Sequence, residues 1–417
     1  MPPIDAEIHN MRLLAHNDLG GNGNVGEGVG LHARKGRRTL FVAHAQGPNN
    51  FTGIDVTDPR KPTVVCRTHV PHAAMRSNNL SIVGDLMAVT YQPDVPGEKP
   101  AGVEFFDIAD PRAPRSVGFF DASGPHSRGA HFVNLDGQGY AYVTTGLPDF
   151  EPARGKDHQL FVILDVRDPS RPVEVGRWWI PGQRKGDSET LRYDPLAKYT
   201  PHNINVYPER PDRAYVGYCD GGVVILDIAD KAHPKLVSRL DYHPPLKAGM
   251  THTVMPLFDR GLLVVADEAS DPRGKHLQGP EGWTDGAGFD HPKAIWIMDG
   301  SYEPNLVPLS TLPMPPRDLF KFRGGNFGAH NIHENDPVPT SWKSDQMIFG
   351  TFFNAGLRVY DIADPLRPEE IASFLPPEPA GSDLGAIQMN DVYVDENRVI
   401  YGLDRTTGGL YVLELTL

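Results

Sequence analysis

Short runs of apolar residues recur along the whole chain, and turn-forming residues separate them. Residues 203–240 are typical: NINVY and AYVGY are followed by GGVVILDI and, after a turn, by KLVSRL. Each run has about five or six residues rich in Val, Ile, Leu and Tyr, a composition that favours β-strands. No segment keeps a 3.6-residue period, so we expect an almost entirely β protein.

Groups of four such runs share a recurring motif, which lies between the third run and the fourth. Clear copies read IDVTDPRKP, FDIADPRAP, LDVRDPSRP, LDIADKAHP and YDIADPLRP, and weaker copies begin at Ile297 and Leu410. Each four-stranded unit can bury both faces only against its neighbours. Seven such units predict an all-β, seven-bladed β-propeller, and 43 Gly and 40 Pro in 417 residues fit its many turns.

The last repeat contains only three strand-like runs, NDVYV, RVIYGL and LYVLEL. Near the start of the chain, residues 11–19 read MRLLAHNDL and have no predicted partner of their own. We expect this segment to supply the fourth strand of the last blade and to hide its open edge. Residues 1–417 then form a single propeller domain.

The repeat ending also resembles a known family. The segments AGLRVYDIADPLRP and GGVVILDIADKAHP resemble the ending of LVIVD repeats, and similar endings occur in the selenium-binding protein family. Because these families are similar to β-propellers, the resemblance implies the same architecture for most of this chain. It implies little about chemistry.

A histidine stands at the same position, at the start of the first strand, in four consecutive repeats. The four are His131 in GAHFVNL, His202 in TPHNINV, His252 in MTHTVMP and His330 in GAHNIHE. If the repeats close into a ring, these imidazoles meet near its axis, and converging neutral imidazoles bind transition metals. The alternative is a histidine that caps each strand or bonds a neighbouring blade. The equivalent positions in the other repeats are Glu27, Asn78 and Asn390.

Four imidazoles without a thiolate suit one divalent Fe, Cu, Ni, Mn or Zn ion, and Fe(II) is the favoured metal. Ligands set around an axis leave coordination positions open, unlike a closed structural zinc site. The arrangement is similar in geometry to the four-histidine iron site of carotenoid-cleaving oxygenases, which are also seven-bladed propellers. That resemblance implies an iron centre.

Several charged residues are expected at the same end of the ring. Metal-bound histidines need acceptors that fix their tautomers, and such carboxylates are also candidate catalytic groups; as an alternative, each is an ordinary turn residue. Arg405 is a candidate to hold an anionic substrate by bidentate pairing. The carboxylate candidates are Glu27, Asp267, Glu268, Glu334 and Asp404.

Long loops are predicted on the face that carries the histidines, at 144–160, 183–201, 266–293 and 315–329. Long loops in compact domains are usually functional, so we expect them to cover a pocket for a small organic substrate. The glycine-rich segment Gly20–Gly30 lacks the strand-then-helix context of a phosphate loop. We interpret it as a flexible link into the first blade.

Composition narrows the partners. A net charge of −13 argues against nucleic-acid binding. The mean hydropathy is −0.37, and no run approaches the roughly 18 apolar residues of a membrane span. The start of the sequence lacks the pattern of a signal peptide, and only two cysteines occur, so we expect a reducing, cytoplasmic location.

These patterns favour a metal-dependent oxygenase or oxidase acting on a small organic substrate. A redox-neutral lyase, hydratase or isomerase that uses the metal as a Lewis acid is the first alternative. A non-catalytic propeller that binds a protein partner is the second. The substrate, the use of dioxygen and the oligomeric state stay open.

Overall fold

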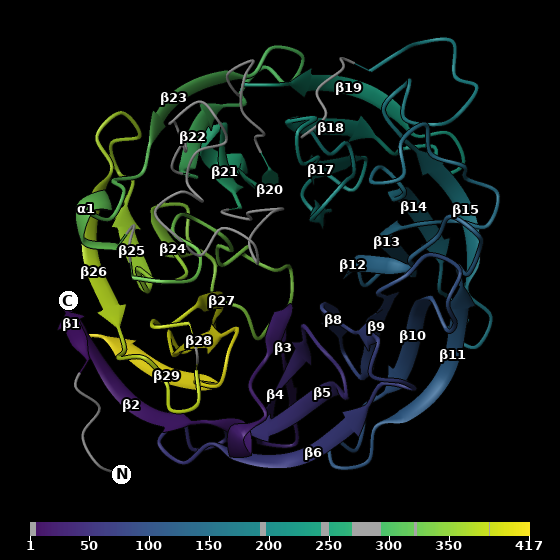
Figure 1. The fold of residues 1–417 in the computed structure, drawn as a ribbon. Coiled ribbons are helices and arrows are strands. Elements are labelled where there is room, and N and C mark those ends of the chain that lie inside the picture. The colour runs from purple at the N-terminus through teal and green to yellow at the C-terminus, as the bar shows by residue number, and fades with distance from the viewer. Residues whose placement is uncertain (1–5, 192–196, 243–249, 269–292, 321–322, 383) are drawn as a thin grey trace.

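The computed structural model describes residues 6–191, 197–242, 250–268, 293–320, 323–382 and 384–417. Seven antiparallel sheets stand in a ring around a common axis, each with its first strand innermost (Figure 1). The predicted seven-bladed propeller is therefore confirmed. No helix among these residues is long and apolar enough to span a membrane.

The first four blades follow one another along the chain. Blade one comprises β3 (Val25–Arg34), β4 (Arg37–His44), β5 (Asn49–Asp55) and β6 (Thr63–His69). Blade two comprises β7 (Met75–Arg76), β8 (Leu80–Val83), β9 (Leu86–Pro93), β10 (Gly102–Asp107) and β11 (Arg115–Asp121). Blade three comprises β12 (Ala130–Leu135), β13 (Tyr140–Thr145), β14 (Leu160–Asp165) and β15 (Val173–Trp178). Blade four comprises β16 (Ile204–Asn205), β17 (Arg213–Gly217), β18 (Val223–Asp227) and β19 (Lys235–Leu240).

The last three blades complete the ring. Blade five comprises β20 (Thr251–Leu257), β21 (Leu262–Asp267), β22 (Ile295–Asp299) and β23 (Val307–Thr311). Blade six contains β24 (Met347–Thr351), β25 (Leu357–Asp361) and β26 (Glu369–Leu375). Blade seven contains β27 (Met389–Val394), β28 (Ile400–Asp404) and β29 (Leu410–Leu415). Within the described ranges, helical structure is limited to single turns: η1 (Leu19–Gly21), η2 (Phe258–Arg260) and α1 (Arg317–Phe320).

The start of the chain completes two blades. β2 (Met11–Asn17) pairs antiparallel with β29, so the prediction that residues 11–19 close the last blade is confirmed. The strand ends at Asn17, two residues earlier than expected. A strand that was not predicted, β1 (Glu7–His9), pairs with the outer edge of β26 in blade six. Both outer edges are therefore covered by the same N-terminal segment.

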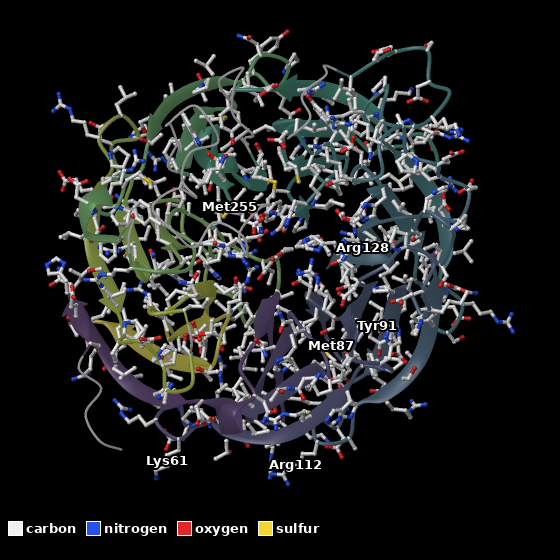
Figure 2. All side chains as sticks on the ribbon, in the orientation of Figure 1. Lys61, Met87, Tyr91, Arg112, Arg128 and Met255 are labelled. Carbon is white, nitrogen blue, oxygen red and sulfur yellow. The ribbon has the colours of Figure 1, made fainter. Side chains whose placement is uncertain are left out.

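The repeated motif forms the turn between the third and fourth strands of a blade. Its first aspartate accepts a hydrogen bond from the N–H two residues on, as Asp227 does from Ala229 at 2.9 Å, and the second repeats this, as Asp230 does from Ala232 at 3.0 Å. Blades one, two, three and six make the same two bonds. Two successive Asx turns thus explain the spacing of the motif. Lys61 and Arg112 in these motifs lie at the outer rim (Figure 2).

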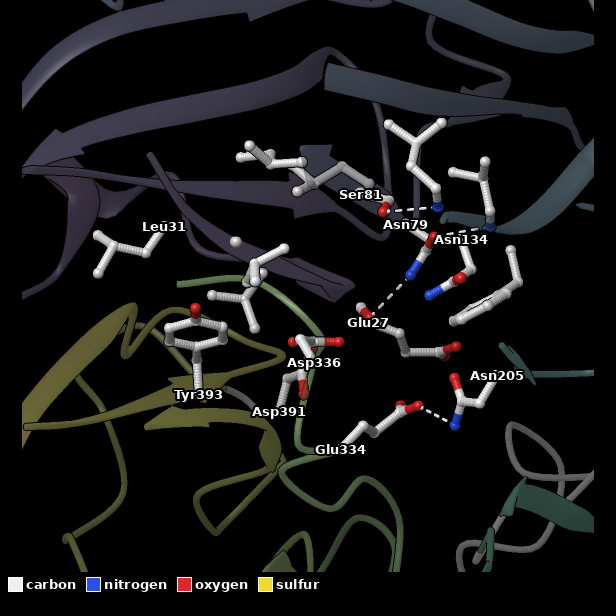
Figure 3. Close-up of a pocket in the computed structure, with 18 of the residues that line it drawn as sticks. Glu27, Leu31, Asn79, Ser81, Asn134, Asn205, Glu334, Asp336, Asp391 and Tyr393 are labelled. Atoms are coloured by element: carbon white, nitrogen blue, oxygen red, sulfur yellow. Dashed lines mark hydrogen bonds between the residues drawn. The ribbon is translucent and has the colours of Figure 1, made fainter. Parts of the chain in front are cut away.

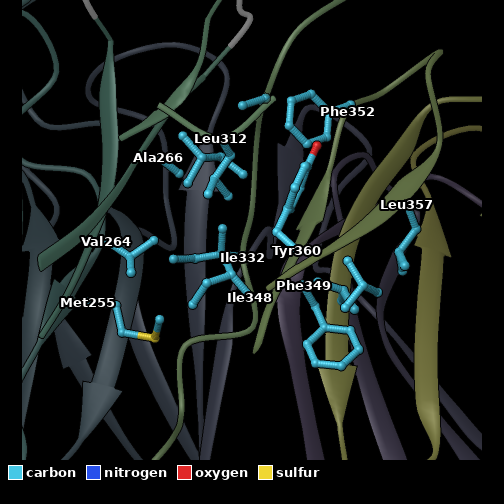
Figure 4. Packing of buried hydrophobic residues seen from close by; sticks show 14 of the residues in the cluster. Met255, Val264, Ala266, Leu312, Ile332, Ile348, Phe349, Phe352, Leu357 and Tyr360 are labelled. Atoms are coloured by element: carbon cyan, nitrogen blue, oxygen red, sulfur yellow. The ribbon is translucent and has the colours of Figure 1, made fainter. Parts of the chain in front are cut away.

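Apolar side chains fill the spaces between neighbouring blades. Met255 and Val264 of blade five pack in one cluster with Ile332, Ile348 and Tyr360 of blade six (Figure 4). All five are at most 2% exposed. Blade faces are covered on both sides, and for this reason the inner strands read as nearly continuous apolar runs.

The glycine-rich segment is not the flexible link that the sequence suggested. Residues 25–34 form β3, the innermost strand of blade one. Gly26 and Gly28 flank Glu27, and a Cβ on either glycine would lie 2.2 Å from a backbone atom of residues 78–80. The glycines are therefore needed where β3 lies directly against the chain of blade two.

Candidate metal centre

Four histidines from blades three to six meet at the axis of the ring. We call His131, His202, His252 and His330 the axial histidines; each is at most 6% exposed. Ring centroids of successive members lie 4.4, 3.9 and 4.7 Å apart. The Nε2 atoms of His131 and His202 are 2.9 Å apart. The structure therefore brings together the four side chains that the repeat alignment singled out.

Each axial histidine lies at a break in the regular pairing of its strand. Ala130 and Phe132 face consecutive residues of β13, which leaves His131 as the extra residue. His252 is the extra residue between Thr251 and Thr253 in the same way. In blades four and six, backbone hydrogen bonds pair two inner residues with a single residue of the neighbouring strand. The two inner residues are His202 and Asn203 in blade four, and His330 and Asn331 in blade six. Such bulges re-aim side chains, and here they turn the imidazoles to the axis.

The Nδ1 atom of every axial histidine faces a hydrogen-bond acceptor. His131 lies 3.1 Å from Gln92 Oε1, and His202 lies 3.1 Å from Asn203 Oδ1. His252 lies 2.7 Å from Thr253 Oγ1, and His330 lies 2.7 Å from the carbonyl oxygen of Asn390. These acceptors place the proton on Nδ1 and leave the lone pair of Nε2 directed at the axis.

Two of the residues that hold the tautomers follow their histidine directly in the sequence. Asn203 follows His202, and Thr253 follows His252. A third, Gln92, is held in place by Arg76, whose Nε donates to its Oε1 at 2.7 Å. None of the three was predicted from the sequence. For Asn203 and Thr253, the available signal was a polar residue immediately after an axial histidine.

Two carboxylates lie against the same Nε2 atoms. Glu27 Oε2 is 3.5 Å from Nε2 of His131, and Glu27 Oε1 is 3.6 Å from Nε2 of His330. Glu268 lies 3.7 Å from His202 and 3.6 Å from His330. Glu27 also lies 3.8 Å from His202 and 3.6 Å from His252.

Electrostatics favour neutral imidazoles and charged carboxylates. Burial lowers the pKa of His131 to about 4 and also lowers the pKa of His202 and of His330. Burial alone would raise the pKa of Glu27 and of Glu268. Hydrogen bonds or positive charge from the surrounding histidines, and for Glu268 also the charge of Arg405, outweigh it, so the pKa of each carboxyl group is below its usual value. Neutral nitrogen donors and anionic oxygen donors are the forms that bind metals.

This donor set fits a divalent cation. Nε2 of His252 and Nε2 of His330 are buried and have no hydrogen-bond partner among the described residues. Lone pairs of nitrogen and carboxylate oxygen face one another across the axis, an arrangement that is repulsive unless a cation lies between them. Ligand atoms within each of three groups lie within 4.8 Å of one another: Glu27 with His252 and His330, Glu27 with His131 and His202, and Glu268 with His202 and His252.

Arg405 is also at the centre. Its Nη2 donates to Glu27 Oε1 at 2.8 Å, and its Nη1 lies 4.0 Å from Glu268. Its guanidinium carbon lies 5.3 Å from the ring centre of Phe353, which stacks on His330. Of the predicted charged residues, Glu27, Glu268 and Arg405 are therefore gathered around the axial histidines.

Three other predicted residues have different surroundings. Asp267 accepts hydrogen bonds from Tyr242 Oη at 2.7 Å and from Trp296 Nε1 at 2.8 Å. Asp404 caps the turn after β28, where it accepts from the backbone of Gln388 and of Gly408. The structure does not place either carboxylate with the imidazoles.

Glu334 touches the centre only through another residue. It accepts a hydrogen bond at 2.6 Å from Asn203 Nδ2, and Asn203 Oδ1 holds the Nδ1 proton of His202. Glu334 therefore helps to orient His202 through Asn203, as predicted for an orienting carboxylate.

Two of the predicted long loops carry a residue near His131. His158 lies in residues 144–160 and Lys198 in residues 183–201, and both are close enough to His131 for their charges to interact with it. Most of the predicted loop 266–293 lies outside the described residues.

Comparison with known proteins agrees with this architecture. The LVIVD repeat model matches residues 156–179 and 212–241, so the chain carries LVIVD repeats in blades three and four. No match is found among curated proteins.

Two solved structures illustrate the shared fold. One is the β-propeller domain of Myceliophteria thermophila Cps50 (Swd1), with 14% identity, a TM-score of 0.55, and coverage of 99% of this chain and 100% of that one. The other is a hypothetical selenium-binding protein from Sulfolobus tokodaii, with 15% identity, a TM-score of 0.54, and coverage of 99% of this chain and 86% of that one. Identities this low establish the fold alone.

Proposed function

We propose that this protein is a metalloenzyme that holds one divalent transition metal on the axial histidines and oxidises a small organic substrate there. One observation carries the proposal: all four Nδ1 atoms face acceptors, while the four Nε2 atoms face a common centre where two of them have no hydrogen-bond partner in the described part of the chain. A histidine that only caps a strand has no need of this arrangement.

Charge and donor type favour divalent iron, manganese or zinc. Four neutral imidazoles with the carboxylates of Glu27 and Glu268 carry a charge of about −2, which a divalent cation neutralises. Imidazole nitrogen with carboxylate oxygen suits Fe(II), Mn or Zn better than Cu(I), which prefers sulfur. Bound there, such a metal supplies a centre that activates dioxygen or polarises a substrate oxygen.

The protein's own charges point to an anionic substrate. Burial lowers the pKa of Arg76, the charge of Glu27 opposes this, and the charges of Arg405 and Arg128 add to the lowering, so both of these guanidinium groups are close enough to act on Arg76. Arg128 lies toward the axis in Figure 2 and is half-buried. A carboxylate on the substrate would pair with one or more of these three guanidinium groups.

Glu268 is the residue placed to move a proton. Glu27 is bound by Arg405 at 2.8 Å, whereas Glu268 lies 4.0 Å from the same guanidinium. Glu268 is therefore the less tightly paired of the two carboxylates, and in this proposal it accepts or returns a substrate proton while Glu27 stays fixed.

Metal analysis is the first test. We would measure metal content by plasma mass spectrometry on untagged protein, on a His202→Ala His252→Ala variant, and on His233→Ala, whose side chain is 76% exposed. We expect about one equivalent of metal in the wild type and in His233→Ala, and none in the double variant. Wild-type protein that binds no metal, even after soaking, would overturn the proposal and leave a non-catalytic binding propeller.

Oxygen consumption separates the two kinds of chemistry. Metal-free protein would be loaded with Fe(II) without oxygen, mixed with a panel of small organic acids, and exposed to air. We expect substrate-dependent oxygen uptake that the double variant lacks. Stoichiometric metal without uptake, combined with turnover that needs no oxygen, would replace oxidation by a lyase, hydratase or isomerase reaction.

A further inference from the structure

A cavity of about 70 Å³ is lined by residues of the innermost strands, among them Glu27 (Figure 3). Glu27 lines one end of it and is also the carboxylate that lies within 3.8 Å of all four Nε2 atoms. The other lining residues follow the axial positions along the innermost strands, such as residues 132–135 after His131. The cavity therefore leads from the centre toward the opposite end of the ring.

The charge of this cavity is one-sided. Glu334, Asp336 and Asp391 line it, and Figure 3 shows their carboxyl groups around the space that Glu27 enters. None of the described lining residues is Lys, Arg or His. Lys343 is close enough to Asp336 to affect its charge, but it does not line the cavity.

None of these three carboxyl groups forms an ion pair with a described Lys, Arg or His. Burial raises the pKa of Glu334 to about 7 and that of Asp336 to about 6. Burial also raises the pKa of Asp391 well above its usual value, and the charges of Glu334 and Glu27 add to the effect. A cation in the cavity would relieve this repulsion.

An uncharged oxygen in the same wall also lacks a partner. Asn134 lines the cavity and is only 8% exposed, and its Oδ1 has no hydrogen-bond partner among the described residues. Buried amide oxygens are normally bonded. An amide oxygen beside carboxylates is the donor type that divalent cations take in place of water.

The cavity is connected to the metal ligands by direct contacts. Glu334 accepts hydrogen bonds from Asn203 at 2.6 Å and from Asn205 at 2.5 Å. Asn203 in turn holds the Nδ1 proton of His202. An ion bound by the carboxylates of the cavity would therefore lie next to Glu27. Only Asn203 would separate Glu334 from His202.

The arginines that interact with or lie near Glu27 do not line the cavity. Arg405 is bound to this carboxylate, and Arg76 and Arg128 lie nearby. A metal ion that approached past these arginines would meet three positive charges, whereas an ion in the cavity meets three carboxyl groups. The arginines and the cavity thus favour ligands of opposite charge.

We propose that the acidic cavity is a transient binding site for the divalent metal ion and the route by which the ion reaches the axial histidines. Asp336, which is half-buried, receives the ion at the outer end, and Glu334 and Asp391 replace part of its water before Glu27 passes it to the imidazoles. This inference rests on the proposed metal centre.

The rate of metal uptake tests the route. Metal-free full-length protein would be mixed with Co²⁺ in a stopped-flow instrument, and the visible absorption of histidine-bound cobalt would be followed. We expect Glu334→Gln Asp336→Asn to slow uptake at least tenfold, to weaken its dependence on ionic strength, and to leave the final stoichiometry at one. The matched control is Asp345→Asn Glu369→Gln, which removes two exposed carboxylates elsewhere and should take up Co²⁺ like the wild type.

A second pair of variants avoids Glu334, whose loss could disturb His202 through Asn203. Val338 is half-buried and lines the cavity. Val338→Lys should slow Co²⁺ uptake by charge, and Val338→Met should not. Wild-type rates in both Val338→Lys and the double variant would overturn the route while leaving the centre intact. Absence of cobalt absorption in the wild type would instead overturn the metal centre itself.

Discussion

Arg38 of blade one and Asp395 of blade seven form an ion pair across the seam where the ring closes. Nη2 of the arginine lies 2.7 Å from Oδ2 of the aspartate, which is 1% exposed. The N–H groups of Asn397 and Val399 donate to the other carboxylate oxygen at 2.9 Å each. The pair joins segments 357 residues apart in the chain.

Removal of one partner should open this seam. Arg38→Met leaves the carboxylate of Asp395 buried without its cation, and we expect the free energy of unfolding to fall by about 2–4 kcal/mol. Asp395→Asn in the same background should restore part of the loss, because the uncompensated charge is gone. Urea unfolding of the two single variants and the double variant measures the coupling. Purely additive effects would show that the pair contributes nothing to closure.

The two N-terminal strands should tolerate charge very differently. Ala15 of β2 is 4% exposed, whereas Ile8 of β1 is 42% exposed. Ala15→Asp buries an unpaired carboxylate against blade seven and should lower stability by about 3 kcal/mol or more. Ile8→Asp should change it by less than about 0.5 kcal/mol. Thermal unfolding of both variants makes the comparison, and equal effects would contradict the different depths of the strands.

Replacement of Gly28, the glycine that follows Glu27, should be destabilising even when the new residue is alanine. A Cβ at position 28 would lie 2.2 Å from the backbone nitrogen of Leu80. We expect Gly28→Ala to push β3 away from blade two, to lower the free energy of unfolding by about 1–3 kcal/mol, and to weaken metal binding by displacing Glu27. Gly155 has no atom within 4 Å of such a Cβ and is the matched control. Denaturation and metal titration of both variants test this; a Gly28→Ala protein that matches Gly155→Ala would refute the close approach.

Loss of a single hydroxyl should weaken the metal centre. Thr253 Oγ1 accepts the Nδ1 proton of His252 at 2.7 Å, and Thr253→Val removes that acceptor at nearly constant volume. We expect metal affinity to fall roughly 10–100-fold, as found for other residues that orient a ligand. Competition titration against a chromophoric chelator gives the affinity. Thr253→Ser keeps the hydroxyl and should retain most of it.

Acid should destabilise the metal-free protein through a buried histidine away from the axis. His333 lies with Nε2 2.7 Å from the carbonyl oxygen of Trp342, and burial lowers its pKa from 6.5 to about 4. Because the unfolded chain binds this proton at higher pH than the folded one, stability is full above about pH 6.5 and falls as the pH drops toward 4. The loss is about 3 kcal/mol for His333.

The pH dependence can be assigned by substitution. Urea unfolding with a chelator present, from pH 7 to pH 4.5, should show a shallower decline in His333→Gln than in the wild type. His44 is buried with a pKa also lowered to about 4, so part of the decline should persist in the variant. Identical slopes would mean that His333 is protonated equally in the folded and unfolded chains.

The propeller architecture could be predicted from the sequence because the turns that define each repeat form between residues close together in the chain. Asp227 and Asp230 form two Asx turns within a few residues, so the D-x-x-D spacing reports the turn directly. The missing strand of the last repeat likewise pointed to β2. β1 could not be predicted in the same way, because blade six already had its own strands and an extra outer strand leaves no gap in the repeat.

The histidine ligands of the candidate metal centre could be predicted from the sequence, but the residues and bulges that orient them could not. The axial histidines recur at one repeat position, which makes them visible in the sequence. Asp267 and Glu268 are adjacent, yet only Glu268 faces the imidazoles, since neighbouring residues at a strand end point to opposite sides. The role of Gln92 and the positions of the bulges depend on contacts between blades, so no local sequence pattern indicates them.

The pairing of β2 with β29 has a consequence for the protein's synthesis. One of the first strands to be translated has as its partner the last strand, so it must wait while roughly 400 residues are added. At ~5–20 residues per second this is roughly 20 to 80 s. All four axial histidines, by contrast, precede residue 331 and leave the ribosome before closure is possible. We therefore expect the nascent chain to expose an unpaired edge until β29 has been made, and to depend on chaperones during that interval.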